Sequence, residues 1–326
     1  MVVFVDPNMA NSMELLAGHL QGAAERDDVE VVAIVDTAPE PPPRLELARS
    51  LAVRAVHFTC NPIDGAGKTL RPLFSTCAAL ARRWRVPLLA PRERGINDPE
   101  FVETVRRLRP DVGISLMVAQ IFRAPLLDAC AVPLNYHPGL LPHYRGIAAT
   151  GWSIYKSERE SGFTFHRMVE QVDRGPILLQ GTVPLGPRSI AAQTERAKTK
   201  AARARLAEWF DILAAREFAG VEQTDGSTFT RVDERAIRTV EHPEQLSLDE
   251  LDLRLRAFEY IYLTLAGQDW AATALRRLGR SRRDRRLAFT TADGVAVRVS
   301  RLRHVPPMMY RALKPLYGSP HSPPRR

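Results

Sequence analysis

The chain has 326 residues, of which 45% are hydrophobic and 25% are charged, so it is long enough to bury the cores of two domains. Its apolar runs are strand-sized and fall short of the ~18 residues of a membrane span, so we expect no membrane partner. The N-terminal MVVFVD opens as a strand and lacks the pattern of an export signal, so we expect a cytoplasmic location.

The formal net charge of +9 at pH 7 favours acidic partners such as phosphates, diphosphates or RNA. A solvated basic face explains the same charge, and much of the excess lies in RRLGRSRRDRRLA at 276–288. The cysteines are widely spread without metal-ligand spacing (Cys60, Cys77 and Cys130), and the eight histidines form no HExxH pair. The sequence therefore predicts buried or neutral thiols and no metal site.

The first half of the chain alternates short apolar strands with amphipathic helices. Strand patterns cover 2–6, 29–37, 86–90, 111–117 and 132–136, and helical patterns cover 11–26, 44–56, 73–84 and 98–108. This alternation is typical of a parallel, doubly wound, Rossmann-like α/β sheet with both faces covered. No GxGxxG follows the first strand, and the GKT at 67–69 lacks the earlier glycine of a P-loop because Pro62 stands there. Neither nucleotide motif is therefore predicted.

The second half contains two further strands, a long helix and a small separate domain. We expect a short helix at 152–158, strands at 162–170 and 175–185, and a helix at 189–217 that leads away from the sheet. A capping box of Ser247 and Glu250 opens a helix at 247–258, and residues 287–302 form a hairpin that turns at Asp293-Gly294. The expected division is a first domain at 1–188, a helical linker at 189–236, a small α+β, barrel-like domain at 237–312, and a disordered tail at 313–326.

Two polar residues stand where a central strand ends, in NYHPGLLPHYRG at 135–146. Asn135 and His137 lie there on the side of the sheet where α/β proteins bind ligands. A carboxylate follows at Asp173, in a loop between two strands with Gly175 and Pro176 behind it. An amide, an imidazole and a carboxylate suit acyl transfer, because they can hold an oxyanion and move a proton. The residues alone leave a structural role for all three equally open.

The motif NYHPGLLPHYRG, followed about thirty residues later by TFHRMVEQVDRGPILLQ at 164–180, resembles the N10-formyltetrahydrofolate-dependent formyltransferases. The similarity is clear from about 98 to 186, including RPDVGISLMVAQIFRAPLLD at 109–128, and is weak in LDLRLRAF at 251–258. The resemblance implies that an amine attacks the formyl carbon of 10-formyltetrahydrofolate. Asn135 and His137 would then stabilise the oxyanion, while Asp173 would hold the imidazole and help move a proton towards N10.

The resemblance also implies binding residues and a co-substrate, with no metal. Contacts to 10-formyltetrahydrofolate are expected from Val118, Ala119, Gln120, Ile121, Leu140 and Asp173, and contacts to the acceptor from Tyr144, Arg145 and Gly146. Arg145 suits a phosphate or carboxylate, although a structural role that pins the loop is an equal alternative. His143 and His166 are expected to be structural.

Departures from the family pattern bear on the acceptor. Glycine at 139, where the family usually has serine, is a mild change in a turn. The methionyl-tRNA members usually have RGAAPI where RGIAATGW stands at 145–152, and a loop rich in Gly and Lys or Arg where PEPPP stands at 39–43. These departures favour a small-molecule amine, such as an amino sugar nucleotide or an amino-acid-derived metabolite, over the alternative of methionyl-tRNA. A 10-formyltetrahydrofolate hydrolase and a non-catalytic folate- or RNA-binding module are further alternatives. Three roles are open for the small domain: recognition of the acceptor, formation of a homodimer, or support of the first domain.

Overall fold

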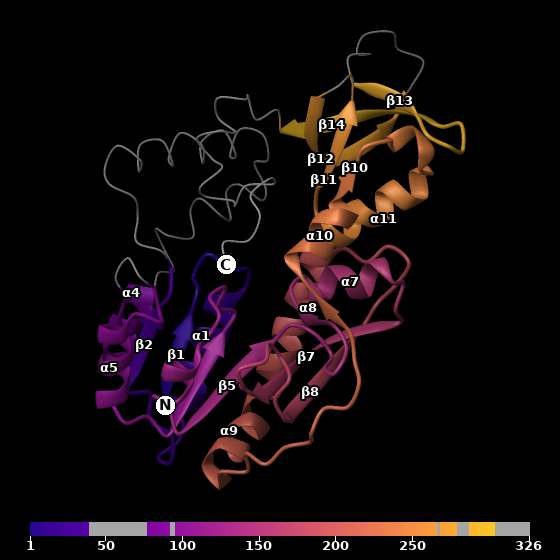
Figure 1. Ribbon diagram of the computed structural model, residues 1–326. Coiled ribbons are helices and arrows are strands. Elements are labelled where there is room, and N and C mark those ends of the chain that lie inside the picture. Colours follow the sequence, from indigo (N-terminus) through magenta and orange to yellow (C-terminus); the bar gives the residue numbers. More distant parts are fainter. Residues whose placement is uncertain (39–76, 92–94, 266–267, 279–286, 304–326) are drawn as a thin grey trace, which may run out of the picture. The chain divides into compact units, whose positions relative to one another are not determined.

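The computed structural model describes residues 1–38, 77–91, 95–265, 268–278 and 287–303 (Figure 1). The helix expected at 44–56, the GKT segment, Cys60 and the tail at 313–326 lie outside these ranges. Contacts between residues divide the chain into Met1–Glu234, here called the N-terminal unit, and Arg235–Arg326, here called the C-terminal unit. The four-part division expected from the sequence stays a prediction.

The N-terminal unit is built on a seven-stranded sheet in the order β3-β2-β1-β4-β5-β7-β8. The strands are β1 (Val2–Val5), β2 (Ala33–Asp36), β3 (Leu88–Leu89), β4 (Val112–Leu116), β5 (Val132–His137), β7 (Glu160–Arg167) and β8 (Ile177–Pro184). The first five run parallel, whereas β7 and β8 are antiparallel to their neighbours. The predicted α/β, doubly wound class is confirmed, because the strands of the first half are parallel, and β7 and β8 extend the sheet as antiparallel strands. The short loop that joins β7 to β8 leaves no room for a crossover helix, so these two strands must pair antiparallel.

Helices cover both faces of this sheet, as a doubly wound fold requires. One face packs on α1 (Ser12–Ala24), α4 (Cys77–Trp84), α8 (Ala191–Ala204) and α9 (Leu206–Ala215). The other packs on α5 (Pro99–Arg107) and α6 (Ala124–Leu127). Each face of the sheet has its own hydrophobic core cluster, the first under α1, α4, α8 and α9 and the second under α5 and α6. Side chains alternate along β1, so Val3 and Val5 belong to the first cluster and Val2 and Phe4 to the second.

The segment expected to leave the sheet as one helix at 189–217 instead packs on it as two helices that meet at Arg205. Ala202, Leu206, Trp209, Phe210 and Leu213 recur at helical spacing and all belong to the first core cluster. Trp209 is fully buried and stacks on Phe165 of β7 with ring centroids 4.3 Å apart. This apolar stripe keeps both helices on the sheet, so the sequence-based expectation was wrong.

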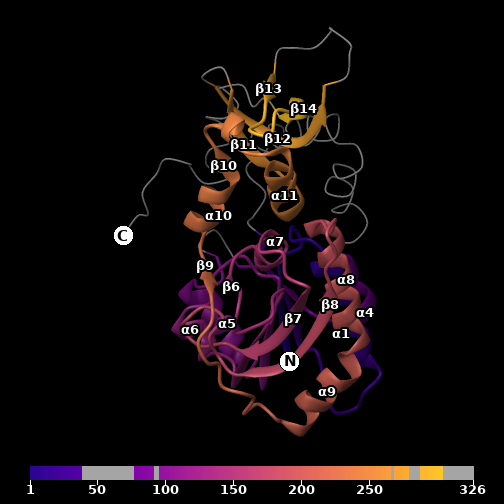
Figure 2. The same cartoon turned by 90° about the vertical axis from the view of Figure 1, so that its right-hand side faces the viewer.

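After α9 the chain returns towards the strand-helix connection that follows β5. Its strand β9 (Thr228–Phe229) pairs in parallel with β6 (Arg145–Gly146), and Val221 forms an isolated bridge with Ile177 of β8 (Figure 2). We call residues 217–230 the return segment. The Phe229 ring stacks on Trp152 of α7 (Ala149–Tyr155) at 4.3 Å, so the return segment is anchored by packing as well as by backbone pairing.

The C-terminal unit contains a five-stranded sheet, and helix α11 (Leu248–Phe258) packs on it with one face. The sheet order is β10-β11-β12-β14-β13, made of β10 (Thr239–Val240), β11 (Ile261–Leu265), β12 (Gln268–Arg277), β14 (Ala296–Arg303) and β13 (Ala288–Thr290). Helix α11 begins as expected, with the Ser247 hydroxyl accepting from the Glu250 amide at 3.1 Å. The hairpin of β13 and β14 is antiparallel, so the prediction of a small α+β domain is confirmed. Helix α10 (Arg231–Arg238) and the 3-10 turn η1 (Pro243–Gln245) precede α11.

Within the described ranges, no helix has both the length and the apolar character needed to cross a bilayer. Cys77 and Cys130 are free and buried, and burial raises the pKa of both thiols, that of Cys130 to about 12. These two cysteines are therefore neutral thiols, as the sequence predicts.

If α9 belongs to the core of the N-terminal unit, Trp209→Ala should lower the free energy of unfolding by about 3–5 kcal/mol through lost burial and a new cavity. Val232→Ala is the matched control, because Val232 is 77% exposed. Chemical denaturation measures both. A loss below about 1 kcal/mol in Trp209→Ala would contradict the packing.

His19 lies in the same core and makes stability depend on pH. Its Nδ1 lies 2.8 Å from the carbonyl of Leu15, and burial lowers its pKa from 6.5 to about 4. Because the folded-state pKa is lowered, the stabilisation is complete above pH 6.5 and is lost as the pH falls towards 4. We expect about 2 kcal/mol to be lost between pH 7 and pH 5. Urea denaturation should show that His19→Leu lacks this component, whereas an unchanged slope would show that His19 is not buried as a neutral ring.

Candidate active site

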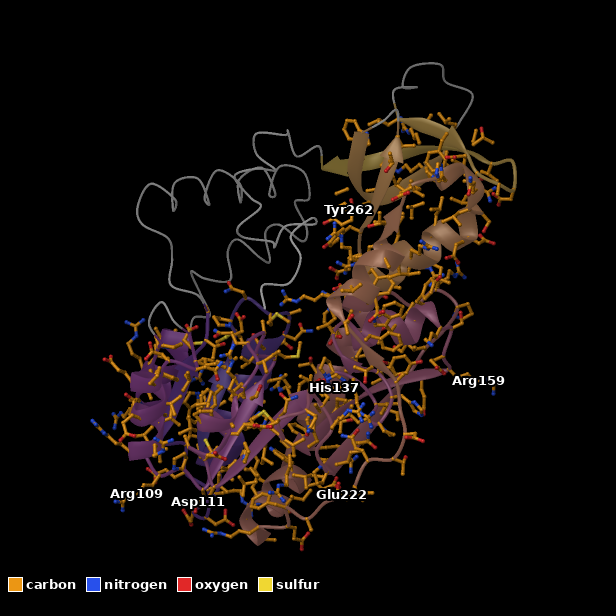
Figure 3. All side chains as sticks on the ribbon, viewed as in Figure 1. Arg109, Asp111, His137, Arg159, Glu222 and Tyr262 are labelled. Atoms are coloured by element: carbon orange, nitrogen blue, oxygen red, sulfur yellow. The ribbon has the colours of Figure 1, made fainter. Side chains whose placement is uncertain are left out.

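Side chains along β5 alternate between the two faces of the sheet, and this alternation separates the predicted catalytic residues from the first core cluster. Leu134 and Tyr136 point into the first core cluster, so Asn135 and His137 share the opposite face. Across the sheet Asn135 pairs with His166 and His137 with Thr164 of β7. His137 can be located in Figure 3 within the N-terminal unit. The structure therefore brings Asn135 and His137 together and adds His166, which the sequence analysis expected to be structural.

Asp173 is the centre of this polar cluster. Its Oδ2 accepts from the Gly146 amide at 2.8 Å and lies 3.3 Å from His137 Nδ1. Its Oδ1 lies 3.4 Å from both Asn135 Nδ2 and His166 Nε2. The three side-chain distances are long for hydrogen bonds, so these contacts are weaker than the one from the Gly146 amide. The prediction that Asn135, His137 and Asp173 meet thus agrees with the geometry.

The backbone partners of the two imidazoles assign their protons. A carbonyl only accepts, so His137 Nε2 carries a hydrogen that it donates to the Tyr144 carbonyl at 2.8 Å. His166 Nδ1 likewise donates to the Arg167 carbonyl at 2.8 Å. In a neutral His137 ring, Nδ1 is left as a lone pair that faces the carboxylate of Asp173. Two acceptors that face each other form a place for one proton, which we call the proton slot.

Electrostatics keep the proton slot empty at rest. Burial alone would raise the pKa of Asp173. Protonated His137 and His166 bring positive charge, protonated His166 also brings a hydrogen bond, and the Gly146 amide donates another, so this pKa is held well below its usual range. Burial lowers the pKa of His137, and the charge of Asp173 opposes this shift without cancelling it. At neutral pH the pair is therefore an ionised carboxylate beside a neutral imidazole.

Asn135 lies between the other two acceptors of the cluster. Its amide nitrogen is 3.1 Å from His166 Nε2 and 3.4 Å from Asp173 Oδ1, so its two hydrogens can satisfy both. The neutral tautomer of His166 needs such a donor, because its Nδ1 hydrogen is already given to a backbone carbonyl. His166 therefore orients the Asn135 amide from the neighbouring strand.

Side chains from other elements donate hydrogen bonds to three backbone carbonyls of the turn after His137. Lys198 Nζ donates to the Pro138 carbonyl at 2.6 Å, Thr164 Oγ1 to the Gly139 carbonyl at 2.7 Å, and Gln180 Nε2 to the Leu141 carbonyl at 2.8 Å. Gly139 has no room for a side chain, since an added Cβ would lie 2.6 Å from His137 Nε2 and 2.8 Å from Ala149 Cβ. Glycine at this position thus matches the close packing of the imidazole.

The three residues expected to contact the acceptor make hydrogen bonds that hold the backbone and side chains around the polar cluster. The Arg145 side chain is buried and donates to the Gln223 side chain and to the Thr224 carbonyl, both at 2.9 Å. The Tyr144 hydroxyl donates to Glu158, and its ring stacks on Phe229. The Gly146 amide binds Asp173, and its φ of 88° is the left-handed conformation that favours glycine. A role of these residues in acceptor binding stays a prediction.

Gln223 of the return segment was missed by the sequence analysis. Its Nε2 donates to the carbonyls of Asp173 at 2.8 Å and Gly175 at 2.7 Å, while its Oε1 accepts from Arg145. It therefore holds the loop that carries the central carboxylate. No motif surrounds Gln223 in the sequence, so only the fold reveals it.

The residues expected to contact folate lie on the loop after β4, apart from Leu140 and Asp173. The Gln120 side chain donates to the Thr37 carbonyl at 2.9 Å and accepts from the Ile96 amide at 3.2 Å, so it braces the loop. Val118 packs against the second core cluster, whereas Ala119 is exposed and Ile121 is 63% exposed. Leu140 is half-buried near Gly162. Their contacts with folate stay a prediction.

A family model described as formyl transferase matches residues 2–208, more than half of the chain. The chain belongs to the formyl transferase family. The family predicted from the two motifs is thereby confirmed, and the matched region contains the whole Asn135, His137 and Asp173 cluster.

A methionyl-tRNA formyltransferase of Geobacter sulfurreducens is 32% identical over 168 residues, which cover 50% of this chain and 51% of that protein. The chain thus spans about half the length of this curated relative.

Among solved structures, a sugar N-formyltransferase from a Shewanella species is similar with a TM-score of 0.58 and 18% identity, covering 86% of this chain and 98% of that one. HypX from Aquifex aeolicus, in complex with tetrahydrofolic acid, is similar with a TM-score of 0.55 and 18% identity, covering 74% of this chain and 44% of that one. These likenesses confirm the fold.

The crowding at Gly139 generates a prediction for this formyl transferase family member. Gly139→Ala should lower the free energy of unfolding by about 1–3 kcal/mol and shift the imidazole NMR signals of His137, because the new methyl group displaces the ring. Gly186→Ala is the control, since nothing lies within 4 Å of a Cβ added there. Equal stability and unchanged His137 signals in both variants would show that the turn does not confine the ring.

Proposed function

We propose that the protein transfers a formyl group from 10-formyltetrahydrofolate to the primary amine of a small molecule. The observation that carries the proposal is the proton slot between His137 and Asp173, with the Asn135 amide beside it, inside the region that matches the family. The transfer needs no nucleophile from the protein, because the acceptor amine attacks the formyl carbon itself. It needs a donor for the oxyanion and a temporary place for a proton.

The chain supplies both requirements. As the amine attacks, a bond forms between its nitrogen and the formyl carbon, and the amine must lose a proton. The proton slot takes this proton and returns it to N10 when the bond from the formyl carbon to N10 breaks. While the proton is in the slot, His137 is positively charged and stabilises the oxyanion. The Asn135 amide contributes by turning one hydrogen from Asp173 Oδ1, a contact of 3.4 Å, to the oxyanion. A donor of this kind contributes about 3 kcal/mol to the transition state.

Exposed apolar side chains support folate as the donor. Ile121 is 63% exposed on the loop after β4, and Val169 and Val172, 40% and 46% exposed, lie on the loop that carries Asp173. The loop after β4 leaves beside the His137 end of β5, because β4 and β5 are parallel. The loop after β7 leaves beside Leu134, because β7 is antiparallel to β5, and returns to Asn135 and His137 at Asp173. Apolar surface beside a few oriented polar groups suits the aromatic body of a folate. Ile121, Val169 and Val172 would contact the ring system, and the Asn135 cluster would receive the formyl group.

The acceptor class rests on separate observations. The fold likeness to a sugar N-formyltransferase extends over nearly the whole of that protein, whereas the sequence similarity to a methionyl-tRNA formyltransferase extends over about half of it. A small-molecule amine is therefore the first proposal. The net charge of +9 favours tRNA as the second candidate, because clustered positive charge is the footprint of nucleic-acid binding.

The test follows the release of tetrahydrofolate from 10-formyltetrahydrofolate by absorbance. The acceptors are offered in turn: none, a panel of amino-sugar nucleotides and amino acids, and charged initiator tRNA. We expect amine-dependent release by the wild type and a loss of about 100- to 1000-fold in His137→Gln. His143→Gln is the matched control, because His143 is exposed on the same loop.

Each other outcome supports a different function. Release with water alone would indicate a hydrolase, and folate binding without release would indicate a binding module. Release that requires tRNA and falls steeply with salt would replace the small-molecule acceptor by tRNA. Full activity of His137→Gln would overturn the proposed role of the proton slot.

A further inference from the structure

Lys198 of α8 carries a buried charge directly behind the turn that follows His137. Its side chain is 0% exposed. Its Nζ donates to the Pro138 carbonyl at 2.6 Å and to the Thr150 hydroxyl, and it lies 3.3 Å from Glu195 Oε1. The three hydrogens of an ammonium thus have three acceptors, contributed by the β5–α7 turn, by α7 and by α8 itself.

The ion pair between Glu195 and Lys198 does not by itself explain why the lysine is buried. Glu195 and Lys198 are three residues apart on one helix, and such a pair forms as readily at the surface without the cost of burying a charge. Lysine is almost never fully buried unless it is paired. The contact that the surface cannot provide is the one to the Pro138 carbonyl, next to His137. The Thr150 hydroxyl donates onward to Glu195, so the acceptors are themselves held in place.

From these contacts we infer that Lys198 is a positioning residue for formyl transfer, whose ammonium clamps the Pro138 carbonyl and so fixes the His137 ring between Tyr144 and Asp173. The inference deepens the proposed function and rests on it. The Pro138 carbonyl belongs to the residue that follows His137, so a displacement of this carbonyl would also displace the imidazole relative to Asp173. Lys198 does not touch the reacting atoms and acts only through His137.

The charge of Lys198 has a second effect on the same ring. The groups that face His137 are Asp173, His166 and Lys198, and Glu195 faces Lys198 in turn. Burial is the largest cause that lowers the pKa of His137, the charge of Asp173 raises it, and the charges of His166 and Lys198 lower it. The ammonium therefore partly offsets the carboxylate and helps to keep the proton slot empty until the amine releases its proton.

The test compares Lys198→Met with Lys200→Met. Lys200 is exposed on the same helix, and both variants lose one positive charge, so only the buried contact differs between them. NMR titration of histidine labelled with ¹³C measures the pKa of His137, and the His137→Gln variant assigns the signal. Loss of the Lys198 charge raises this pKa, whereas rotation away from Asp173 lowers it, so the position of the ring is read from the ¹³C signals themselves. We expect the His137 signals to shift in Lys198→Met and to stay unchanged in Lys200→Met. Because this titration needs no acceptor, its outcome is independent of the proposed function.

Kinetics provide the second readout, with the acceptor that supports tetrahydrofolate release. Lys198→Met should lower kcat by about tenfold or more, with the KM for 10-formyltetrahydrofolate unchanged, because misplacement of a catalytic group affects the chemical step. Lys198→Gln tests the charge if the Met variant does not fold, since it keeps a polar group but loses the ammonium. Unchanged ¹³C signals of His137 in the variant that folds would overturn the inference, as would an unchanged kcat.

Discussion

The burial of the Asp173 carboxylate is the constraint on which the rest of the site depends. A carboxylate whose side chain is only 9% exposed is costly unless donors surround it. Here the Asn135 side-chain amide and the Gly146 backbone amide donate to it, and the imidazoles of His137 and His166 lie 3.3 and 3.4 Å from it. These groups belong to β5, β6 and β7. The strands must therefore be in register before the charge is stabilised, and the charge in turn favours that register.

The return segment explains why the carboxylate stays in place although it lies on a loop. Asp173 has a φ of 55°, a left-handed conformation that a loop does not hold by itself at no cost. Gln223 holds the carbonyls of Asp173 and Gly175, and Phe229 packs between Tyr144 and Trp152. A segment far along the chain thus fixes the backbone of the central residue. The buried guanidinium of Arg145 donates to Gln223 and so supports the same loop. This contact explains the burial of Arg145 without a ligand.

Local patterns account for much of this architecture. The apolar runs of β1, β4 and β5 and the Pro99 start of α5 are readable from neighbouring residues, because the sheet buries both faces and Asp98 caps the helix. The period of two along an extended strand also places Asn135 and His137 on one face, since they are two residues apart in the sequence.

Other features depend on partners that are distant in the sequence. The apolar stripe of α9 is that of an ordinary amphipathic helix, and only the fold shows that it packs on Phe165 of β7. The sequence around Gln223 and Lys198 is typical of surface residues, and only the fold shows their acceptors. His166 lies inside a recognised motif but has no polar neighbour in the sequence that marks it as part of the site. Its role follows only from its register opposite Asn135. Residues that act on a site from other elements are therefore the ones that sequence patterns miss.

The arrangement of charges around His137 suits a reaction in which one proton moves without being lost. If His137 were already protonated at rest, the proton slot would be full and the attacking amine would have no base. If Asp173 were absent, the slot would hold a proton too weakly to retain it until N10 accepts it. The carboxylate on one side, opposed by burial and by the buried ammonium of Lys198, sets the proton affinity between these limits. The cost of burying Lys198 is thus explained by a requirement of the proposed reaction and not by the stability of the fold, to which a buried ion pair contributes little.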